Sequence, residues 1–454
     1  MGLSVTYRQR HPERTPFYQC LEDYWEEFKE SYRNFYERDY GSLRPVVDKT
    51  VDRFSECGIF RHGFARIRCP ECRQEYLLAF SCKTRYFCPS CQAQRVAAFV
   101  EWITGEILQE VPHRQLVWTI PKVLRPTFRR DRKLLGELSR AAWRSLCQYF
   151  GHALGCDSVP AAIFAIQTYG DQLNWHPHLH SLLADGAWGK SNGAFQPIAW
   201  LDADILSSAF RQQVLAMMVS KRRLSAEFAQ NISNWRHSGF QVHCGPPVEA
   251  DHPQALERLA AYILRPSFAS TRVRYLAGSG QVQYRTAKGV ARSMDALDWI
   301  AQVVSHIPDP GEQMVRYYGW YSNASRGKRR KPGVSVPVEA QVQDTPQPDS
   351  DGEHFAQRRR SWARLLKKIY EVDPLRCPHC GSEMQIIAWI EQSEVIRKIL
   401  RHLDLWERPQ RSPPPKLFPH KLETFMASLS PRQAQEIRAS TDSVFWDDVP
   451  VWNG

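Results

Sequence analysis

The sequence contains no uninterrupted apolar run of the length that crosses a membrane, which is about 18 residues or more. Its opening segment, MGLSVTYRQRHPERTPF, also lacks the apolar core of a secretory signal. There is no G-x-x-x-x-G-K-[ST] phosphate-binding loop, and no internal repeat is visible. We therefore expect a cytoplasmic protein without a membrane partner, a P-loop or a repeat architecture.

Basic residues outnumber acidic residues in this sequence. Sixty Lys and Arg stand against 48 Asp and Glu, which leaves a net charge of +12 and a pI near 9.1. A surplus of this size favours polyanionic partners, of which nucleic acid is the usual one. The 15 Trp and 17 Tyr could stack on unpaired bases or fill the core.

Composition and periodicity divide the chain into five parts. Helical spacing marks the N-terminus, cysteines mark the next segment, and a Pro-, Gly- and Asp-rich stretch without periodicity reads as a linker. The predicted parts are an N-terminal helical segment (1–54), a zinc-binding module (55–95), a catalytic domain (96–331), the linker (332–355) and a small C-terminal region (356–454).

The pattern of strands and helices in residues 96–331 predicts an α+β fold. A strand at 114–120 precedes a helix at 134–151, and two further strands follow at 161–169 and 177–184. This order implies a central antiparallel sheet with flanking helices. Further helices are expected at 18–39, 93–111, 205–230 and 253–264, and a hairpin at 272–275 and 281–286.

Two C-x-x-C knuckles predict a zinc site. Cys69-Pro-Glu-Cys72 and Cys88-Pro-Ser-Cys91 are separated by 15 residues, close to the spacing of zinc ribbons. In a chain without a secretory signal these thiols should stay reduced. We expect the four thiolates to surround one structural Zn²⁺ and to hold a basic loop surface against DNA, although such charges also occur on a merely solvated face.

Two further sets of zinc ligands are incomplete. Cys57, His62 and Cys82 supply three ligands for a second zinc. The single knuckle Cys377–Cys380 could be completed by a histidine, either His379 or His402, or could be a simple turn.

Three alternate histidines in NWHPHLHSLL predict a catalytic metal site. His176, His178 and His180 share one face if this segment is a strand. A turn centred near residues 172–173 would place Gln167 directly opposite His178, on the same side of the sheet. Gln167 and His176 are the competing third ligands.

Two imidazoles and an amide oxygen make a weakly charged, open metal site. Such a site suits Mg²⁺ or Mn²⁺ with water and a phosphate in the remaining positions. The alternative is Zn²⁺-dependent hydrolysis of a small substrate.

The expected helix at 253–264 offers a nucleophile. Its apolar residues recur at positions 256, 259, 260 and 263, which leaves Tyr262 at the edge of the buried face with Arg258 and Arg265 beside it. Two guanidiniums stabilise a phenolate and clamp a phosphate, so Tyr262 could attack phosphorus. The alternative is a core tyrosine with solvated arginines.

Several segments of the sequence resemble those of the rolling-circle transposases of bacterial insertion sequences. These transposases belong to the HUH nuclease superfamily, named for the motif His, hydrophobic residue, His. The resemblance rests on RHPERT, GFARIRCPEC, FSCKTRYFCPSC, IQTYGDQLNWHPHLHSLLADG, AAYILRPSFASTRVRY, VRYYGWYSNASRGKRR and DPLRCPHCGSEMQIIAWI. It implies that His178-Leu179-His180 is the HUH motif and that Tyr262 and Arg265 form the catalytic Tyr-x-x-Arg pair.

The resemblance also implies a mechanism. Tyr262 would cleave single-stranded DNA at an element end, form a 5′-phosphotyrosine and release a 3′-hydroxyl without ATP. Relatives can carry a second tyrosine four residues earlier, where this chain has Arg258. The chain therefore resembles a single-tyrosine member. The substitutes for a second tyrosine are Tyr275, Tyr317, Tyr318 and Tyr321.

The basic run RGKRRK is the remaining candidate for DNA contact. Together with Arg258 it supplies the predicted DNA-binding residues Arg326, Lys328, Arg329, Arg330 and Lys331, unless the run is a solvated tail. Three other functions stay open: a non-catalytic zinc-dependent DNA-binding regulator, a metal-dependent hydrolase of small phosphoesters, and a decayed transposase that binds without cutting.

Overall fold

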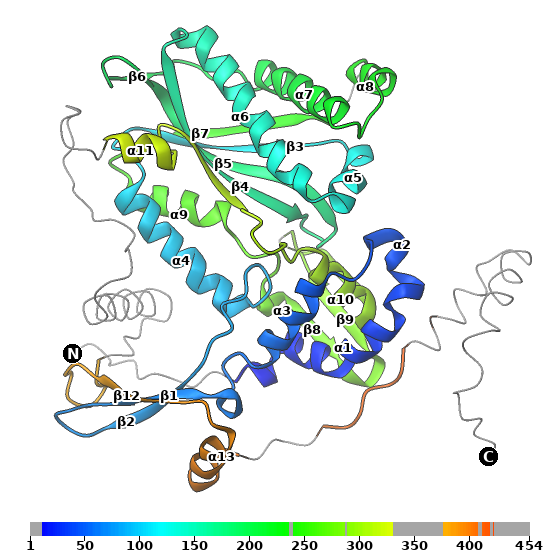
Figure 1. Cartoon of the computed structure of the whole chain (residues 1–454), viewed down its shortest axis with the longest axis vertical. Helices are drawn as coiled ribbons and strands as arrows, with labels where there is room; N and C mark the ends of the chain where they lie inside the picture. Colours follow the sequence, from blue (N-terminus) through cyan, green and yellow to red (C-terminus); the bar gives the residue numbers. More distant parts are fainter. Residues whose placement is uncertain are drawn as a thin grey trace, which may run out of the picture.

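The computed structural model describes residues 11–235, 239–286, 288–329, 376–406, 411–417 and 421. These residues form a large sheet covered by helices, a second helical unit around a small sheet, and a separate three-stranded sheet (Figure 1). Among the helices of the described segments, none combines the length and the apolar character needed to cross a bilayer.

The large sheet has the strand order β11-β4-β5-β3-β7, and every neighbouring pair is antiparallel. The long strands β4 and β5 form its centre because their side chains are apolar on both faces, apart from a few polar residues described below. The strands are β3 (His113–Thr119), β4 (Ser158–Tyr169), β5 (Trp175–Gly189), β7 (Gln241–Val248) and β11 (Val315–Gly319), and β6 (Phe195–Pro197) pairs with β5.

Helices cover both faces of this sheet. On one face, Trp118 and Phe164 pack against each other and against Phe210, with ring centroids 5.9 and 5.1 Å from that of Trp118. That face carries α5 (Arg125–Arg130), α6 (Lys133–Leu154), α7 (Ala203–Ser220) and α8 (Ala226–Ser233). The other face carries α4 (Pro89–Glu106) and α9 (Pro253–Ile263), and α11 (Asn323–Arg329) follows β11.

The N-terminal helices share a core with a later part of the chain. Phe17 contacts Phe54 and Phe268, and Phe268 packs on Trp299. The helix α1 starts at Pro16 because Thr15 caps it, accepting a hydrogen bond from the Tyr18 backbone N–H at 3.3 Å. The unit contains α1 (Pro16–Phe35), α2 (Glu37–Tyr40), α3 (Pro45–Ser55), β8 (Val273–Leu276), β9 (Gln281–Arg285), β10 (Ala291–Asp295) and α10 (Ala296–Ser305).

The third sheet joins residues from both ends of the chain, in the order β12-β1-β2. The hairpin β1 (Phe64–Arg68) and β2 (Glu75–Ala79) is extended by β12 (Gln385–Ile390), and α13 (Ser393–His402) packs behind it.

The structure confirms the expected α+β class and its antiparallel sheet. The expected helix at 205–230 is interrupted, because α7 ends at Ser220 and α8 begins at Ala226. The strands β7, β11 and β12 were not expected. The β7 segment QVHCGPPV, for example, carries a Pro-Pro pair that argues against a strand, and it is tolerated at the sheet edge. The predicted linker 332–355 lies outside the described residues.

Candidate active site and metal centres

Two alternate histidines of β5 meet on one face of that strand. His178 and His180 are 5% and 2% exposed, and their Nε2 atoms lie 3.1 Å apart. Alternation along the strand gives them this common face, while Leu179 points into the opposite core. Two imidazole nitrogens this close together can serve one cation.

Hydrogen bonds at Nδ1 determine which nitrogen of each ring can bind a metal. His178 Nδ1–H donates to the His176 carbonyl at 2.7 Å, so its Nε2 keeps a free lone pair. Gln115 turns its side-chain nitrogen to His180, with Nε2 3.0 Å from Nδ1. For His180 Nε2 to bind a cation, Nδ1 must carry the proton, and Gln115 must then present its oxygen to that proton.

Burial keeps these imidazoles neutral. It lowers the pKa of His178 to about 3 and the pKa of His180 to about 2, with further lowering by neighbouring positive charge. The pKa of His176 is lowered to about 4, mainly by burial and then by Arg125. Neutral imidazole is the form that coordinates metals.

Gln167 lies opposite His178, as the turn geometry predicted. It is 1% exposed, its Nε2 donates to the Ile263 carbonyl at 3.0 Å, and its Oε1 accepts from Arg265 Nε at 3.4 Å. The amide therefore ties the end of α9 to the histidine strand. His176 is half-buried, and its ring packs on that of His178 at 4.9 Å.

Tyr262 lies beside the histidine pair although it comes from a separate helix. Its ring centroid is 5.2 Å from that of His180, in an edge-to-face arrangement, and the side chain is 42% exposed. Arg265 Nη1 donates to the Tyr262 hydroxyl at 3.3 Å, and its guanidinium stands 4.9 Å from the ring centroid. The structure thus brings together the residues that the sequence assigned to one reaction.

The predicted DNA-contact residues are spread over two places. Arg258 is exposed on α9, one turn before Tyr262. Arg326, Lys328 and Arg329 lie in α11, where Arg329 stands over the Trp320 ring at 4.1 Å. Arg330 and Lys331 lie outside the described residues.

The four substitute tyrosines have other partners. The Tyr275 hydroxyl donates to Asp23 at 2.7 Å, in the N-terminal unit. Tyr321 bonds to His113 at 2.7 Å and Tyr318 bonds to Ser139 at 3.0 Å, while Tyr317 packs against Trp102.

The prediction that Cys69, Cys72, Cys88 and Cys91 surround one zinc is wrong, although each of the four lies in a cluster that could hold a metal. The two knuckles belong to two different clusters of four thiols, and within each cluster all Sγ atoms lie within 4.8 Å of one another. The clusters are Cys57, Cys82, Cys88 and Cys91, called here the base cluster, and Cys69, Cys72, Cys377 and Cys380, called here the tip cluster.

The hairpin β1–β2 explains this separation. Cys69 and Cys72 lie in the turn at its tip, whereas Cys57 precedes β1 and Cys82 follows β2. Five residues of strand hold the two ends roughly 17 Å apart. Two of the three members of the second predicted set are therefore found together: Cys57 and Cys82 do share a site, at Sγ distances of 3.6–3.7 Å from Cys88 or Cys91. His62 is not part of it and faces Glu56.

The sequence contains little or no indication of the other residues that contribute to these sites. Gln115 stands in RQLVWTI, a strand without any motif, and only its register with β5 places it beside His180. The partners of the Cys69 knuckle lie more than 300 residues away, at separations of 311 and 305 positions.

Comparisons with known proteins identify both halves of this arrangement. Residues 161–329, which include the histidine strand and Tyr262, match the family described as "Putative transposase", and residues 21–120 match the family described as "Transposase zinc-binding domain". The comparison with solved structures found no match.

Two curated relatives cover most of the chain. The transposase for insertion sequence element IS801 of Pseudomonas savastanoi pv. phaseolicola is 26% identical over 377 residues, which is 77% of this chain and 85% of that protein. The "Putative transposase y4qJ" of Sinorhizobium fredii is 24% identical over 347 residues, 69% of this chain and 85% of that protein. The chain therefore belongs to the IS91 family of insertion-sequence transposases, with a zinc-binding domain preceding the transposase domain.

Proposed function

We propose that this transposase nicks and rejoins single-stranded DNA with Tyr262 as the covalent nucleophile, and so drives rolling-circle-type transposition of an insertion sequence. The observation that carries the proposal is the convergence of a helix tyrosine on a strand histidine pair, with the rings of Tyr262 and His180 5.2 Å apart. Acting on DNA, the protein would work in the cytoplasm, at the nucleoid.

The donor set fits a hard divalent cation. His178 and His180 offer two neutral imidazoles with facing Nε2 atoms, and Gln167 offers an amide oxygen from the opposite strand. This set leaves room for water and a phosphate, as Mg²⁺ or Mn²⁺ requires. A cation bound there would withdraw charge from the scissile phosphate.

The proposed covalent step exchanges one phosphoester for another. The Tyr262 oxygen forms a bond to phosphorus as the bond from phosphorus to the 3′ oxygen breaks, which leaves a 5′-phosphotyrosine and a free 3′-hydroxyl. The phenol proton passes to water, because the side chain is 42% exposed, and the departing 3′ oxygen takes a proton from water. Attack by a 3′-hydroxyl on the phosphotyrosine reverses the exchange, so rejoining needs no ATP.

Arg265 would act on both directions of this exchange. Its Nη1 donates to the Tyr262 hydroxyl, and its Nε bonds to Gln167. A cation held at this position stabilises the phenolate as it attacks and as it leaves.

A labelled-oligonucleotide assay tests the proposal. The full chain is incubated with single-stranded element ends and Mn²⁺, and adducts that survive denaturation are counted. A label at the 3′ end should remain with the protein and a label at the 5′ end should be released. Tyr262→Phe should abolish the adduct, whereas Tyr317→Phe should retain it.

The same assay separates the other functions. A non-catalytic regulator or a decayed transposase would bind the oligonucleotide without forming an adduct. A hydrolase of small phosphoesters would turn over a small diester, and its activity would survive Tyr262→Phe.

A further inference from the structure

The tip cluster is built from two knuckles with the same backbone geometry. In the first, the Cys69 N–H donates to the Gln74 carbonyl at 2.8 Å, and the Arg73 N–H donates back to the Cys69 carbonyl at 3.1 Å. Arg73 has a positive φ of 60°, which is unusual for a residue other than glycine. The turn holds both thiols of Cys69 and Cys72 on one side.

The second knuckle repeats this pattern near the C-terminus. The Cys377 N–H donates to the Ser382 carbonyl at 2.8 Å, and the Gly381 N–H donates to the Cys377 carbonyl at 2.9 Å. Gly381 has a φ of 77° and occupies the position that corresponds to Arg73. Two identical turns, 308 positions apart, therefore present their cysteines to each other.

The sulfur distances suit one tetrahedral ion. Cys69 Sγ lies 3.5 Å from Cys380 Sγ, and Cys72 Sγ lies 3.3 Å from Cys377 Sγ. With Zn–S bonds of about 2.3 Å, a tetrahedron has S···S edges of about 3.8 Å. A disulfide would bring the atoms to about 2.05 Å. Four thiolates in this arrangement select zinc among the common cellular cations.

The end of the small sheet at these cysteines has little core of its own, since the cluster formed with α13 lies at the other end. The buried residues packed there are Ile67, Cys69, Cys377 and Met384. Only β1 and β2 are adjacent in sequence, and β12 joins them through the register from Arg68↔Gln385 to Phe64↔Ile390. A sheet of this size usually needs a metal or another staple.

We propose that the tip cluster holds a zinc ion of its own, distinct from that of the base cluster, and that this ion fastens the C-terminal segment 376–390 to the zinc-binding domain. The zinc-binding family match ends at residue 120, so it does not include two of these four ligands. The proposal does not depend on the chemistry of Tyr262.

Zinc content tests this assignment directly. Atomic emission of the purified full chain should give two zinc ions, and Cys377→Ser with Cys380→Ser should reduce this to one. Cys147→Ser with Cys156→Ser is the matched control, because both thiols are exposed and outside the clusters, and it should retain two.

A second measurement avoids loss of folding in the variant. Wild-type protein loaded with Co²⁺ should show two tetrathiolate centres by its absorption spectrum, and hydrogen exchange of β12 amides should accelerate when the metal is chelated. One metal ion per wild-type chain at saturation, or unchanged zinc content in the Cys377/Cys380 variant, would overturn the proposal.

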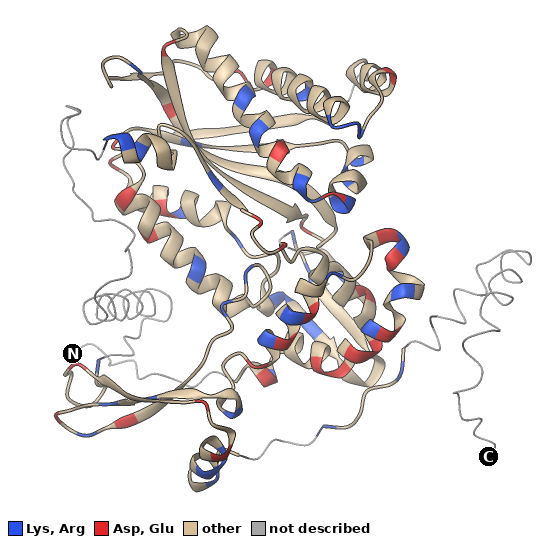
Figure 2. Ribbon diagram, viewed as in Figure 1, with Lys and Arg blue, Asp and Glu red and all other residues tan. Residues whose placement is uncertain are grey.

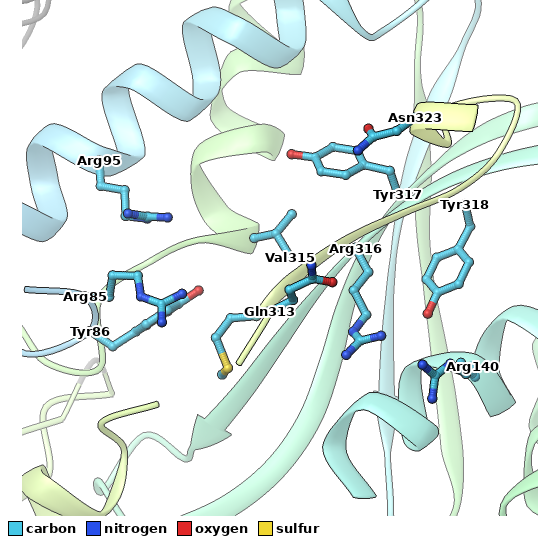
Figure 3. A pocket seen from close by; sticks show the side chains of 11 residues that line it. Arg85, Tyr86, Arg95, Arg140, Gln313, Val315, Arg316, Tyr317, Tyr318 and Asn323 are labelled. Carbon is cyan, nitrogen blue, oxygen red and sulfur yellow. The ribbon is translucent and has the colours of Figure 1, made fainter. Parts of the chain in front are cut away.

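An independent observation concerns a pocket of about 490 Å³ at the edge strand β11. Four arginines line this edge pocket: Arg85 and Arg95 from the α4 side, and Arg140 and Arg316 from α6 and β11 (Figure 3). No Asp or Glu is among the described residues that line it. Figure 2 shows acidic residues gathered on the N-terminal helices, whereas the strands of the large sheet carry few charges.

Three of these four guanidiniums have no carboxylate partner among the described residues. Arg140 pairs with Glu137 at 2.7 Å, and Arg85 donates to the Glu312 carbonyl at 3.1 Å. Within the described segments, Arg95 and Arg316 make no ion pair, and the buried Nε of Arg316 has no hydrogen-bond partner. A site with this composition is suited to an anion that accepts several N–H bonds.

The sheet register places the edge pocket near the histidine pair. Val315 lies opposite Ala165, and Ala165 lies opposite His180, so two strand spacings, about 10 Å, separate Val315 from His180 on one face of the sheet. Arg316 lies on the other face, beside Gly136 of α6, so a bound strand would pass around the sheet edge at β11. The Tyr317 ring, which also lines the pocket, packs 5.5 Å from Trp102. Aromatic rings beside arginines can stack on unpaired bases.

We infer that the edge pocket binds backbone phosphates of the single strand whose scissile phosphate lies at Tyr262. The identity of the strand rests on the proposed function, but binding does not require cleavage. Gly136 makes room for this site, since a Cβ there would lie 2.6 Å from Arg316 Nη2.

Binding of single-stranded oligonucleotides by the Tyr262→Phe chain tests this inference apart from the chemistry. Arg95→Gln with Arg316→Gln should lower affinity at low salt about tenfold and reduce the salt slope by about 1.4, at about 0.7 per phosphate contact.

The control removes the same charge elsewhere. Arg33 and Arg38 are 91% and 94% exposed on the N-terminal helices, so Arg33→Gln with Arg38→Gln should leave the slope nearly unchanged. Equal slopes for the two double variants would contradict the inference.

Discussion

The histidine site and the cysteine clusters are assembled in opposite ways. His178 and His180 are two positions apart on one strand, so local alternation alone brings their Nε2 atoms to 3.1 Å. The tip cluster instead joins thiols 305 and 311 positions apart. Sequence spacing is therefore a reliable guide to ligands on one strand, but it does not reveal which of several knuckles combine.

The cysteine clusters should support folding, whereas the histidine site should support the chemical reaction. The base cluster lies in the core of the N-terminal unit, where Cys57, Cys88 and Cys91 are 3–5% exposed beside Phe17 and Phe54. The histidine pair lies under a single helix and is open toward an exposed tyrosine. We expect cysteine substitutions to affect folding and histidine substitutions to affect chemistry.

The largest effect is expected for Cys88→Ser with Cys91→Ser. Structural zinc sites of this kind contribute on the order of 10 kcal/mol, so the variant should lose most of its folded, soluble protein. Circular dichroism and thermal unfolding measure this loss. If the variant unfolded at the wild-type temperature, the base cluster would have no structural role.

Next in size is His178→Ala with His180→Ala. Adduct formation should fall on the order of 10³-fold, since the groups that stabilise transition-state charge are lost. The unfolding temperature should fall far less than in the cysteine variant, since only two buried rings are lost. His243→Ala, an exposed histidine on β7 of the same sheet, is the control. A large loss of stability with retained adduct formation would show that the histidines support folding and not chemistry.

Gln115 should have an intermediate effect because it acts through His180. Gln115→Leu removes the amide whose oxygen must turn to accept the Nδ1 proton when a cation binds His180 Nε2, and it should raise the Mn²⁺ concentration for half-maximal adduct formation about 10- to 100-fold. Gln115→Glu, which keeps an acceptor, should restore it. An unchanged Mn²⁺ dependence in Gln115→Leu would show that the amide does not position the ring.

Arg258→Ala should have the smallest effect. The side chain is exposed on α9, so one lost phosphate contact should lower single-strand affinity a few-fold and reduce the salt slope by about 0.7. Affinity measured at several salt concentrations checks this. If Arg258→Ala lowered single-strand affinity more than Arg265→Ala does, the roles of the two arginines would have to be exchanged.

The sequence predicted the parts that depend on short-range pattern. Alternation on β5, the hairpin register that sets Gln167 opposite His178, and the apolar face of α9 are all local. The register of β3 and the addition of β12 to β1 depend on tertiary packing. For that reason Gln115 and the exchange of knuckle partners emerge only from the structure.

The most direct measurement identifies the residue that becomes attached to DNA. Wild-type protein is allowed to react with a single-stranded element end and Mn²⁺, the adduct is digested, and the modified peptide is sequenced by mass spectrometry. The account predicts a nucleotide phosphate on the oxygen of Tyr262. A stable phosphate on any other side chain, or cleavage with no covalent intermediate, would contradict it.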